Sequence, residues 1–224
     1  MAQDLKLYIG NRRYSSWSLR PWILMRTQDI PFECEVIPFE QTMGTAAYGG
    51  TARIREVSPT GQVPVLHHGD LVIPGSLAII EYLAELYPQK PIWPDDLRER
   101  ARARAIALEM LAGFGPLRSA CGMNFGRPVA GKDLSEAVLA DVRRIEEIFT
   151  DALERCDGPF LFGKSFGAAD AMYAPVINRL HVYDLPRGEV TQAWMDAVMG
   201  LPAWRQWHKA ALKEPWRIAA YEDL

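Results

Sequence analysis

The sequence predicts an α/β domain followed by an all-helical domain. Before about residue 90, short β-type runs alternate with helical stretches, whereas nearly every long segment after it is helical in character. The segment 88–94 separates the two parts, and its three prolines in seven residues cannot continue a helix. We therefore expect a first domain over residues 1–87, a linker over 88–97 and a helical domain over 98–224.

The first domain is expected to follow the order β-α-β-α-β-β-α. The segments concerned are strands at 5–9 and 33–37, helices at 19–28, 51–57 and 76–87, and a hairpin formed by 63–67 and 71–73. The stretch 41–50 is expected to be a loop, and Pro21 is expected in the first turn of its helix, where proline is tolerated. A helix between the first two strands requires a crossover and makes them parallel, whereas the later pair is antiparallel. This connectivity is that of a thioredoxin-like domain.

The second domain is expected to be a bundle of helices. Its segments are 98–120, 134–155, 168–180, 192–199 and 202–212. The first of them should break or bend around Gly113, Gly115 and Pro116, because glycine and proline disfavour a helix interior. Asp170, near the start of the third, is expected to interact with the positive end of the helix dipole.

Composition excludes several classes of function. The chain has 224 residues with 25 Lys and Arg against 28 Asp and Glu, and a net charge of −3 gives no electrostatic footprint for nucleic acid or an anionic membrane. No apolar run approaches the roughly 20 residues that span a bilayer, and the first residues lack the pattern of a signal peptide. The three cysteines lie far apart and form no CxxC pair, so we expect no disulfide framework and no metal site. The expected location is the cytoplasm, which is reducing.

Two serines at the junction of the first strand and the first helix are candidate catalytic residues. The free N–H groups of a helix N-terminus favour an anion, and Ser15 and Ser16 lie there. A reactive sulfur usually occupies this position in a thioredoxin-like fold, but no cysteine does so here. A serine hydroxyl can instead donate a hydrogen bond to the sulfur of a bound thiol. The alternative is that the serines only cap the helix.

Two further segments are candidates for ligand binding. Pro64, before the hairpin, suits a cis bond in a tight turn, which would expose the backbone of Val63 to a peptide-like ligand; the alternative is an ordinary trans proline. Ser76, after Gly75, is expected at a helix N-cap, which is a natural carboxylate site. A plain N-cap without a ligand is equally compatible with the sequence.

Together these segments resemble the cytosolic glutathione S-transferase family over nearly the whole chain. The segment 14–20, YSSWSLR, is similar to the SSCSxR-type motif of the zeta class and of related bacterial transferases. Segments 63–66 and 75–83 match the cis-proline and Ser-x-Ala-Ile motifs of the family. Segments 109–124 and 163–170 resemble the first long helix of bacterial members and a buried helix start in the second domain. The resemblance implies a cytosolic homodimer with the glutathione S-transferase fold, which uses glutathione as a co-substrate.

The resemblance also implies roles for particular residues. Ser15 would activate the glutathione thiol, and Ser16 is the other candidate because an alignment on Arg20 favours it. Val63 would hold the cysteinyl backbone of glutathione, and Ser76 its γ-glutamyl carboxylate. The full set of implied glutathione-binding positions is Gln62, Val63, Pro64, Gly75 and Ser76.

The implied second substrate is a small hydrophobic electrophile. Its pocket would lie between the domains, with Tyr14, Trp17, Met110, Phe114 and Met123 as candidate walls. Gly75 departs from the family, which has Glu or Asp there; losing one charge-assisted hydrogen bond costs about 10- to 150-fold in affinity. Trp17 replaces the cysteine of the zeta motif, and this departure disfavours a zeta-type isomerase activity.

Three functions therefore compete. The first is a glutathione S-transferase that conjugates glutathione to the electrophile. The second is a glutathione-dependent isomerase or dehalogenase, in which the same thiolate adds to the substrate and is released again. The third is a non-catalytic protein of the same fold with weakened glutathione binding, and its motivation is Gly75 together with the apolar pair Leu111 and Ala112.

Overall fold

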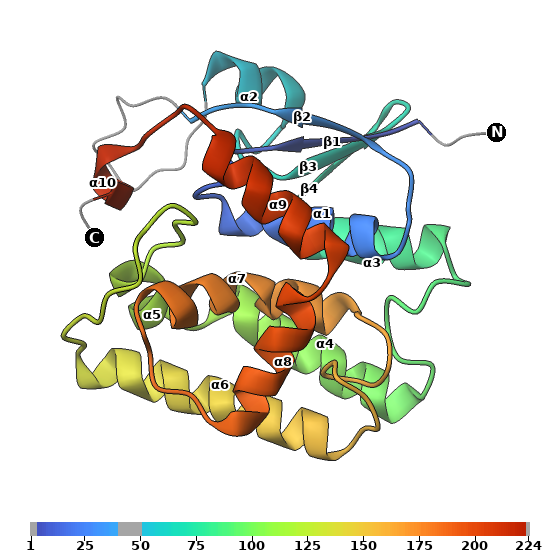
Figure 1. Ribbon diagram of the computed structural model, residues 1–224. Coiled ribbons are helices and arrows are strands. Elements are labelled where there is room, and N and C mark those ends of the chain that lie inside the picture. Colours follow the sequence, from blue (N-terminus) through green and yellow to red (C-terminus); the bar gives the residue numbers. More distant parts are fainter. Residues whose placement is uncertain (1–3, 40–50, 223–224) are drawn as a thin grey trace.

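The computed structural model describes residues 4–39 and 51–222 of the chain. A sheet with its helices forms the upper part of Figure 1, and further helices form the lower part. The expected fold class, a thioredoxin-like domain followed by a helical domain, is confirmed. The loop expected at 41–50 lies outside the described residues. In the part of the chain that the structure describes, no helix combines the length and apolar character needed to cross a membrane.

The sheet is mixed, with its strands in the order β2-β1-β3-β4. Its strands are β1 (Leu5–Ile9), β2 (Glu33–Val36), β3 (Val65–His68) and β4 (Leu71–Pro74). β1 runs parallel to β2, with Leu7 opposite Cys34, and antiparallel to β3, with Leu7 opposite Leu66. The predicted parallel pair and the β3–β4 hairpin are both confirmed. β3 begins two residues later than expected, because Pro64 has no N–H to contribute to a ladder.

Helix α1 (Ser16–Thr27) begins three residues earlier than expected. Ser15 is its N-cap, and the Ser15 Oγ accepts a hydrogen bond from the backbone N–H of Ser18 at 3.4 Å. The earlier start places Pro21 in the second turn, so its prediction in the first turn is wrong. Because proline has no N–H, the helix lacks the hydrogen bond from residue 21 to the carbonyl of Trp17.

Two shorter helices complete the sheet domain. α2 (Ala52–Val57) is capped by the Thr51 hydroxyl, which accepts a hydrogen bond from the N–H of Ile54 at 3.3 Å. α3 (Ser76–Leu86) has Gly75 as its N-cap, and Ser76 is its first helical residue. The prediction that Ser76 itself occupies the N-cap is therefore wrong by one position.

The helical domain confirms the predicted helices, with ends that coincide or differ by at most three residues. Its elements are α4 (Leu97–Ala112), α5 (Gly115–Ala120), α6 (Glu136–Glu154), α7 (Ala168–Val182), α8 (Glu189–Met199), α9 (Pro202–Lys213) and α10 (Ala219–Glu222). The predicted break between α4 and α5 lies at Phe114, whose left-handed conformation (φ 58°) cannot continue a helix. The short α10 was not predicted.

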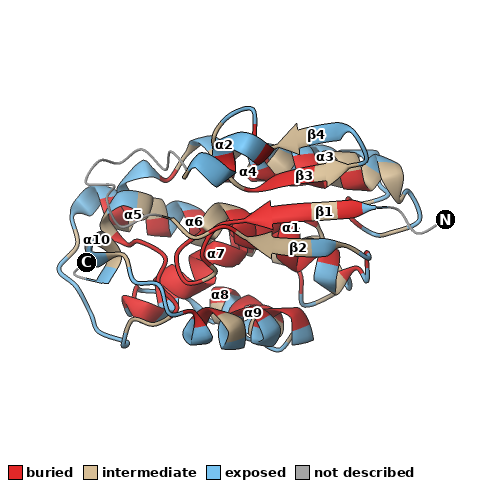
Figure 2. Cartoon of the chain, turned by 90° about the horizontal axis from the view of Figure 1, so that it is seen from above, coloured by how far each residue is buried: buried red, intermediate tan, exposed pale blue. Residues whose placement is uncertain are grey.

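Helix α7 is buried along almost its whole length, as its red ribbon in Figure 2 shows. It lies against α4 in its own domain and against α1 of the sheet domain. Two side chains from the α1 segment reinforce this junction. The Arg20 Nε donates to the carbonyl of Met172 at 2.9 Å, and the Gln28 Nε2 donates to the carbonyl of Phe166 at 2.7 Å.

The first turn of α7 carries a buried carboxylate, that of Asp170, which is 1% exposed. Its Oδ1 accepts hydrogen bonds from the N–H of Leu161 (2.9 Å) and the indole N–H of Trp194 (2.8 Å), and its Oδ2 accepts one from the N–H of Gly167 (3.0 Å). Burial raises the pKa of Asp170 to about 6, although these donors oppose the rise. Asp170 therefore joins three segments in addition to its expected place at the helix dipole.

We expect Asp170→Asn to lower the free energy of unfolding by about 1–3 kcal/mol at pH 7.5. An amide has one acceptor oxygen in place of two, so one buried N–H donor loses its partner. Denaturant titration measures the change, and exposed Asp133→Asn is the control, for which we expect a change within about 0.5 kcal/mol.

The pH dependence of the same variant tests the raised pKa. The folded-state pKa of about 6 exceeds the value of about 3.9 for an unfolded aspartate. The charge-linked stability from Asp170 is therefore fully present below about pH 4 and is lost as the pH rises through 6. The stability difference between the natural protein and Asp170→Asn should be larger at pH 5 than at pH 7.5. A difference that shrinks on acidification would contradict the raised pKa.

Candidate functional site

A cavity of about 320 Å³ opens between the sheet domain and the helical domain. Its sheet-domain wall consists of Tyr14, Ser15, Ser16, Trp17, Phe39, Thr60, Gln62, Val63, Pro64, Pro74, Gly75 and Ser76. Its helical-domain wall consists of Leu111, Arg118, Gly122, Met123, Arg179 and Tyr221. The cavity thus brings together every residue that the sequence suggested for catalysis or glutathione binding.

The turn between β1 and α1 positions the two serines. The N–H of Ser15 donates to the carbonyl of Asn11 at 2.8 Å, and the Ser18 Oγ accepts from the N–H of Gly10 at 3.1 Å. The Ser15 hydroxyl donates to the Ser18 Oγ at 2.7 Å. Ser15 is 5% exposed and Ser16 is half-buried, and both residues line the cavity at the start of α1. Ser15 caps the helix, which was the alternative to a catalytic role, but it also lines the cavity.

The segment before β3 forms the neighbouring part of the wall. The peptide bond between Val63 and Pro64 is cis, which the sequence had suggested beside the trans alternative. The carbonyl of Pro64 accepts a hydrogen bond from the N–H of Gly75 at 3.1 Å. This bond joins the cis-proline segment to the start of α3, so two of the candidate binding segments are held side by side.

The start of α3 contributes a buried hydroxyl to the cavity. Ser76 is 2% exposed, and among the described residues its Oγ has no hydrogen-bond partner. An unsatisfied buried hydroxyl is costly in a folded protein, and a ligand in the cavity can satisfy it. The N-terminus of α3 adds the partial positive charge of the helix dipole, so the position favours an anionic group.

Gly75 has a backbone conformation that explains why a glycine stands there. Its φ is +91°, where residues with a side chain are strained, although no atom lies within 4 Å of the place of a β-carbon. Space therefore does not exclude an acidic side chain at this position, but the backbone opposes it. A carboxylate at position 75, which would accept a charge-assisted hydrogen bond, is therefore absent from the wall.

Tyr14 lies in the same wall, but its hydroxyl is engaged elsewhere. It donates to the carboxylate of Glu222 and accepts from the N–H of Ile218 at 3.3 Å, and its ring packs against that of Tyr221 at 5.4 Å. Burial and the hydrogen bond to Glu222 raise the pKa of Tyr14 to about 12. Among the candidate hydroxyls at the start of α1, those of Ser15 and Ser16 are therefore the ones that fit a ligand.

The expected acceptor walls are only partly correct. Tyr14, Trp17 and Met123 line the cavity, whereas Met110 and Phe114 do not; they are buried at 2% and 6% exposure. After the break that ends α4, other residues line the helical-domain wall, namely Leu111, Arg118, Arg179 and Tyr221. The sequence analysis missed both arginines. A signal was present for one of them, because Arg179 follows a mostly apolar run in α7.

Comparisons with known proteins bear on this site. Residues 14–86 match the family described as glutathione S-transferase, N-terminal domain, and residues 129–210 match glutathione S-transferase, C-terminal domain. Glutathione S-transferase 1 from Dianthus caryophyllus is 31% identical over 180 residues, which cover 79% of this chain and 77% of that protein. The chain belongs to the glutathione S-transferase family. Among the other relatives of this chain, probable maleylacetoacetate isomerase 2 from Drosophila melanogaster is 28% identical over 180 residues, 79% of this chain and 75% of that protein.

A solved structure supports the fold of this chain. The glutathione transferase homolog from Burkholderia gl BGR1, with bound glutathione, superposes with a TM-score of 0.70. The match covers 95% of this chain and 100% of the other, at 22% sequence identity. At this level of identity the likeness concerns the fold.

Glu214, directly after α9, holds the loop that precedes Ser15. Its carboxylate is 6% exposed, and its oxygens accept hydrogen bonds from the N–H groups of Arg12 (2.9 Å) and Arg13 (3.2 Å). Burial raises the pKa of Glu214, and these hydrogen bonds oppose the rise. The Trp207 indole N–H donates to the carbonyl of Arg12 at 3.0 Å. The C-terminal part of the chain therefore fixes the approach to the serines.

We expect Glu214→Ala to lower the free energy of unfolding by about 2–4 kcal/mol, because it leaves two backbone N–H groups without acceptors. Denaturant titration measures the loss, and hydrogen exchange at the amides of Arg12 and Arg13 should become faster. Exposed Glu154→Ala is the control and should change stability by less than about 0.5 kcal/mol. Unchanged exchange at both amides in the Ala variant would show that the carboxylate does not hold the loop.

Proposed function

We propose that this chain is a glutathione transferase that activates the glutathione thiol with a serine hydroxyl for attack on a hydrophobic electrophile. The observation that carries the proposal is one wall of the cavity, which Ser15, Ser16, Val63 and Ser76 line together, and the Ser76 hydroxyl has no hydrogen-bond partner among the described residues. Each of these positions offers the polar group that one part of glutathione requires. The names of the relatives, among them a glutathione S-transferase 31% identical to this chain, support the same activity.

The peptide-like body of glutathione fits the middle of this wall. Val63 precedes β3 and lies outside the ladder, so its backbone can pair with the cysteinyl residue of the ligand. Gln62 is exposed at the cavity and can assist with its amide. Pro64 fixes the turn that presents both of them. The hydroxyl of Ser76 and the N-terminus of α3 would hold the γ-glutamyl carboxylate.

Ser15 is the residue that we propose for thiol activation. An unperturbed thiol with a pKa of ~8.5 is only about 3% ionised at pH 7, and lowering that pKa by ~2 units requires about 2.7 kcal/mol. A hydrogen bond to a charged group supplies roughly 1.5–3 kcal/mol, so one hydroxyl together with the start of α1 is sufficient. The Ser15 proton now directed at the Ser18 Oγ can turn to the sulfur, because the Ser18 hydroxyl can then donate to the Ser15 Oγ.

Ser16 is the alternative to Ser15. It is the first residue of α1, it lines the cavity, and it is half-buried. Its hydroxyl makes no hydrogen bond to another described residue, so it could donate to a sulfur without breaking another bond. Ser15, in contrast, belongs to a network that fixes its position. We favour Ser15 because a fixed donor gives up less conformational freedom when the thiolate forms.

A glutathione-dependent isomerase or dehalogenase is the second candidate. The similarity to a probable maleylacetoacetate isomerase, at 28% identity, favours it, whereas Trp17 in place of the cysteine of the zeta motif disfavours it. Both reactions use the same thiolate, so the residues of the wall keep their roles. The products separate them, because isomerisation regenerates free glutathione and conjugation consumes it.

A non-catalytic protein is the third candidate, and its motivation remains Gly75. The wall lacks the carboxylate that would pair with the γ-glutamyl end, and the φ of +91° opposes its return. We therefore propose glutathione binding that is weaker than an acidic residue at this position would allow. Family resemblance further supports a cytoplasmic homodimer, with domains over 1–87 and 98–224 joined by a linker at 88–97.

We expect Ser15→Ala to reduce kcat/KM for glutathione conjugation by about 10²-fold, since the hydroxyl acts on a charge that forms during the reaction. Conjugation is measured with glutathione and 1-chloro-2,4-dinitrobenzene, a hydrophobic electrophile, across pH 6 to 9. The thiol pKa in the pH profile should rise in the variant. Ser16→Ala should change kcat/KM by less than threefold, and exposed Ser165→Ala is the surface control. Unchanged turnover in the Ser15→Ala/Ser16→Ala double variant would exclude serine activation.

We expect calorimetric titration of the natural protein with glutathione to give a Kd in the millimolar range or below. Ser76→Ala should weaken this binding by about 10-fold or more, because it removes a hydrogen bond to a carboxylate. Among the described residues the hydroxyl has no hydrogen-bond partner, so the variant should unfold at nearly the same denaturant concentration. Equal affinity in both proteins would remove Ser76 from the site, and no binding by the natural protein would favour the non-catalytic candidate.

A further inference from the structure

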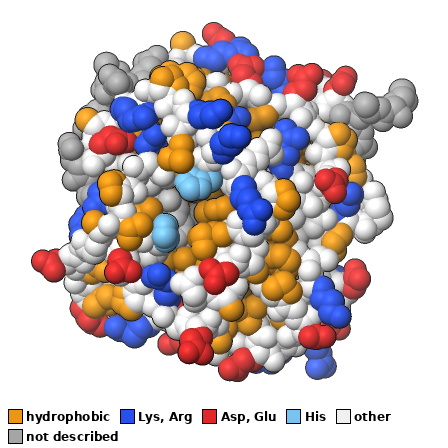
Figure 3. All heavy atoms as spheres, in the orientation of Figure 1, with side chains coloured by type: hydrophobic (Ala, Val, Ile, Leu, Met, Phe, Trp, Pro, Cys, Tyr) orange, Lys and Arg blue, Asp and Glu red, His pale blue; other side chains and the backbone are white. Residues whose placement is uncertain are grey.

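The outward side of helix α9 carries a stripe of positive charge. Arg205, Lys209 and Lys213 are exposed, and their four-residue spacing places their side chains one above another on the same side of the helix. The opposite side is buried and includes Trp204 and Trp207. In the orientation that it shares with Figure 1, Figure 3 shows Lys and Arg side chains along this helix. The stripe therefore faces solvent.

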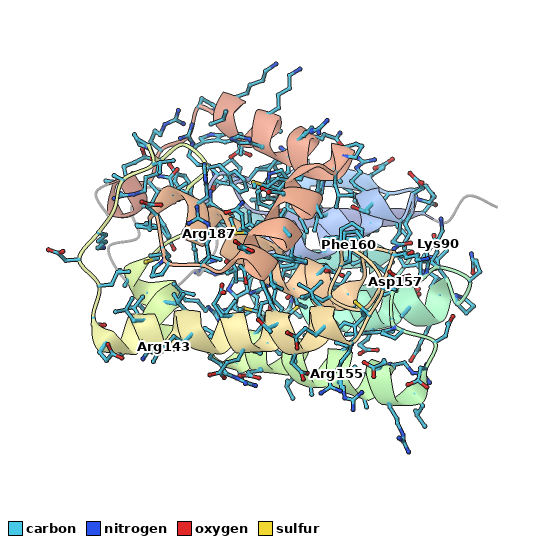
Figure 4. All side chains as sticks on the ribbon, turned by 60° about the horizontal axis from the view of Figure 1, so that its bottom comes forward. Lys90, Arg143, Arg155, Asp157, Phe160 and Arg187 are labelled. Atoms are coloured by element: carbon cyan, nitrogen blue, oxygen red, sulfur yellow. The ribbon has the colours of Figure 1, made fainter. Side chains whose placement is uncertain are left out.

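The three cations of this stripe are not neutralised by neighbouring carboxylates. None of them forms an ion pair within the part of the chain that the structure describes. The only acidic residue of the segment 201–221 is Glu214, which is buried and accepts backbone hydrogen bonds. The pattern differs around α6, where the exposed Arg143 and Arg155, labelled in Figure 4, each pair with a carboxylate. The net charge of −3 is a sum over the whole chain, so it does not reveal the local positive surface at α9.

Two large apolar side chains are exposed beside the stripe. Leu212 is 48% exposed in the last turn of α9, and Trp216, three residues after the helix, is 39% exposed. Apolar groups among cations suit the surface of a bilayer, where the cations contact anionic headgroups and Leu or Trp enters the boundary with the acyl chains. A nucleic-acid backbone would attract the cations but offers no apolar region to Leu212 and Trp216. An acidic protein would need an apolar pocket that fits both of them, so the chemistry of this surface favours lipid.

We propose that this surface docks the protein peripherally on membranes that contain anionic phospholipids. The docking surface consists of Arg205, Lys209, Leu212, Lys213 and Trp216. Helix α9 would lie along the membrane, with its three cations at the lipid phosphates and its two apolar side chains between the headgroups. Each Lys or Arg near an anionic surface strengthens binding by roughly fivefold, so three of them give about a 100-fold preference over a neutral bilayer.

The docking surface is separate from the cavity. None of its five residues is among the described residues that line the cavity, so the inference goes beyond the proposed function and does not depend on it. Membrane docking would also serve that function, because a hydrophobic electrophile partitions from water into the apolar interior of a bilayer. Substitutions in the docking surface should therefore change membrane binding and leave the affinity for glutathione unchanged.

The test measures flotation of the full chain with lipid vesicles of two compositions. One vesicle is pure phosphatidylcholine, and the other contains about 30% phosphatidylserine, which supplies the anionic headgroups. At low salt we expect the natural protein to bind the anionic vesicles at least about 30-fold more tightly than the neutral ones. The preference should fall steeply at about 0.5 M NaCl, because salt screens exposed charges.

Two variants test the two parts of the docking surface. The triple variant Arg205→Gln/Lys209→Gln/Lys213→Gln should bind the anionic vesicles hardly more tightly than the neutral ones, a loss of about 100-fold. The double variant Leu212→Ser/Trp216→Ser keeps the charges and should weaken binding to the anionic vesicles by about fivefold or more, because less apolar surface enters the bilayer. Denaturant titration shows that each variant is folded, and its Kd for glutathione should equal that of the natural protein.

The matched control is Arg98→Gln/Arg143→Gln/Arg155→Gln, which removes three exposed positive charges outside α9. Both triple variants change the net charge by the same amount, so the control should still prefer the anionic vesicles. Equal binding of the natural protein to the two vesicles overturns the inference, and so does an equal loss in the two triple variants. Binding to double-stranded DNA or polyglutamate without binding to vesicles would also overturn it. A failure to bind glutathione bears on the proposed function alone.

Discussion

The packing of α1 between the sheet and α7 is the contact on which both domains and the cavity depend. Leu19, Ile23 and Leu24 of this helix are fully buried, and the Arg20 side chain crosses to a carbonyl of α7. Since the N-terminus of α1 begins at the cavity wall, the same packing fixes the hydroxyls of Ser15 and Ser16. A shift of α1 against α7 would therefore alter stability and the site together. This coupling follows because one helix belongs to the core along its length and to the cavity at its end.

The C-terminal part of the chain reinforces this arrangement from a distance of about 200 residues in sequence. Glu214 accepts two backbone hydrogen bonds from the loop before the serines. The donors, Arg12 and Arg13, lie 202 and 201 positions earlier in the sequence. Glu222 accepts from the Tyr14 hydroxyl, and Tyr221 adds its ring to the cavity. Burial raises the pKa of Glu214, and the paired N–H groups compensate part of the cost of the buried carboxylate. The thioredoxin-like domain thus supplies the chemical groups, and the helical domain limits their movement.

The cavity divides its tasks between two walls with different chemistry. The sheet-domain wall offers hydroxyls, peptide groups and a helix N-terminus, which suit the thiol and the zwitterionic ends of a peptide. The helical-domain wall offers the apolar side chains of Leu111 and Met123 together with Arg118 and Arg179. Trp17 lines the cavity, and the guanidiniums of Arg20 and Arg118 lie over its ring at 4.1 and 4.5 Å from the centroid.

The sequence by itself determined the two-domain fold class, the strand pairing and the segments that carry the serines, Pro64 and Ser76, because these follow from short-range patterns of turns, caps and periodicity. The sequence did not determine the start of α1 or the cap of α3, since the hydroxyl of Ser15 and the positive φ of Gly75 shifted those boundaries. Only the tertiary structure decided that Arg118 and Arg179 face the cavity while Met110 and Phe114 are buried. Helical periodicity identifies an apolar face but not which neighbour covers it, and the break at Phe114 and the packing of α7 settle that in three dimensions.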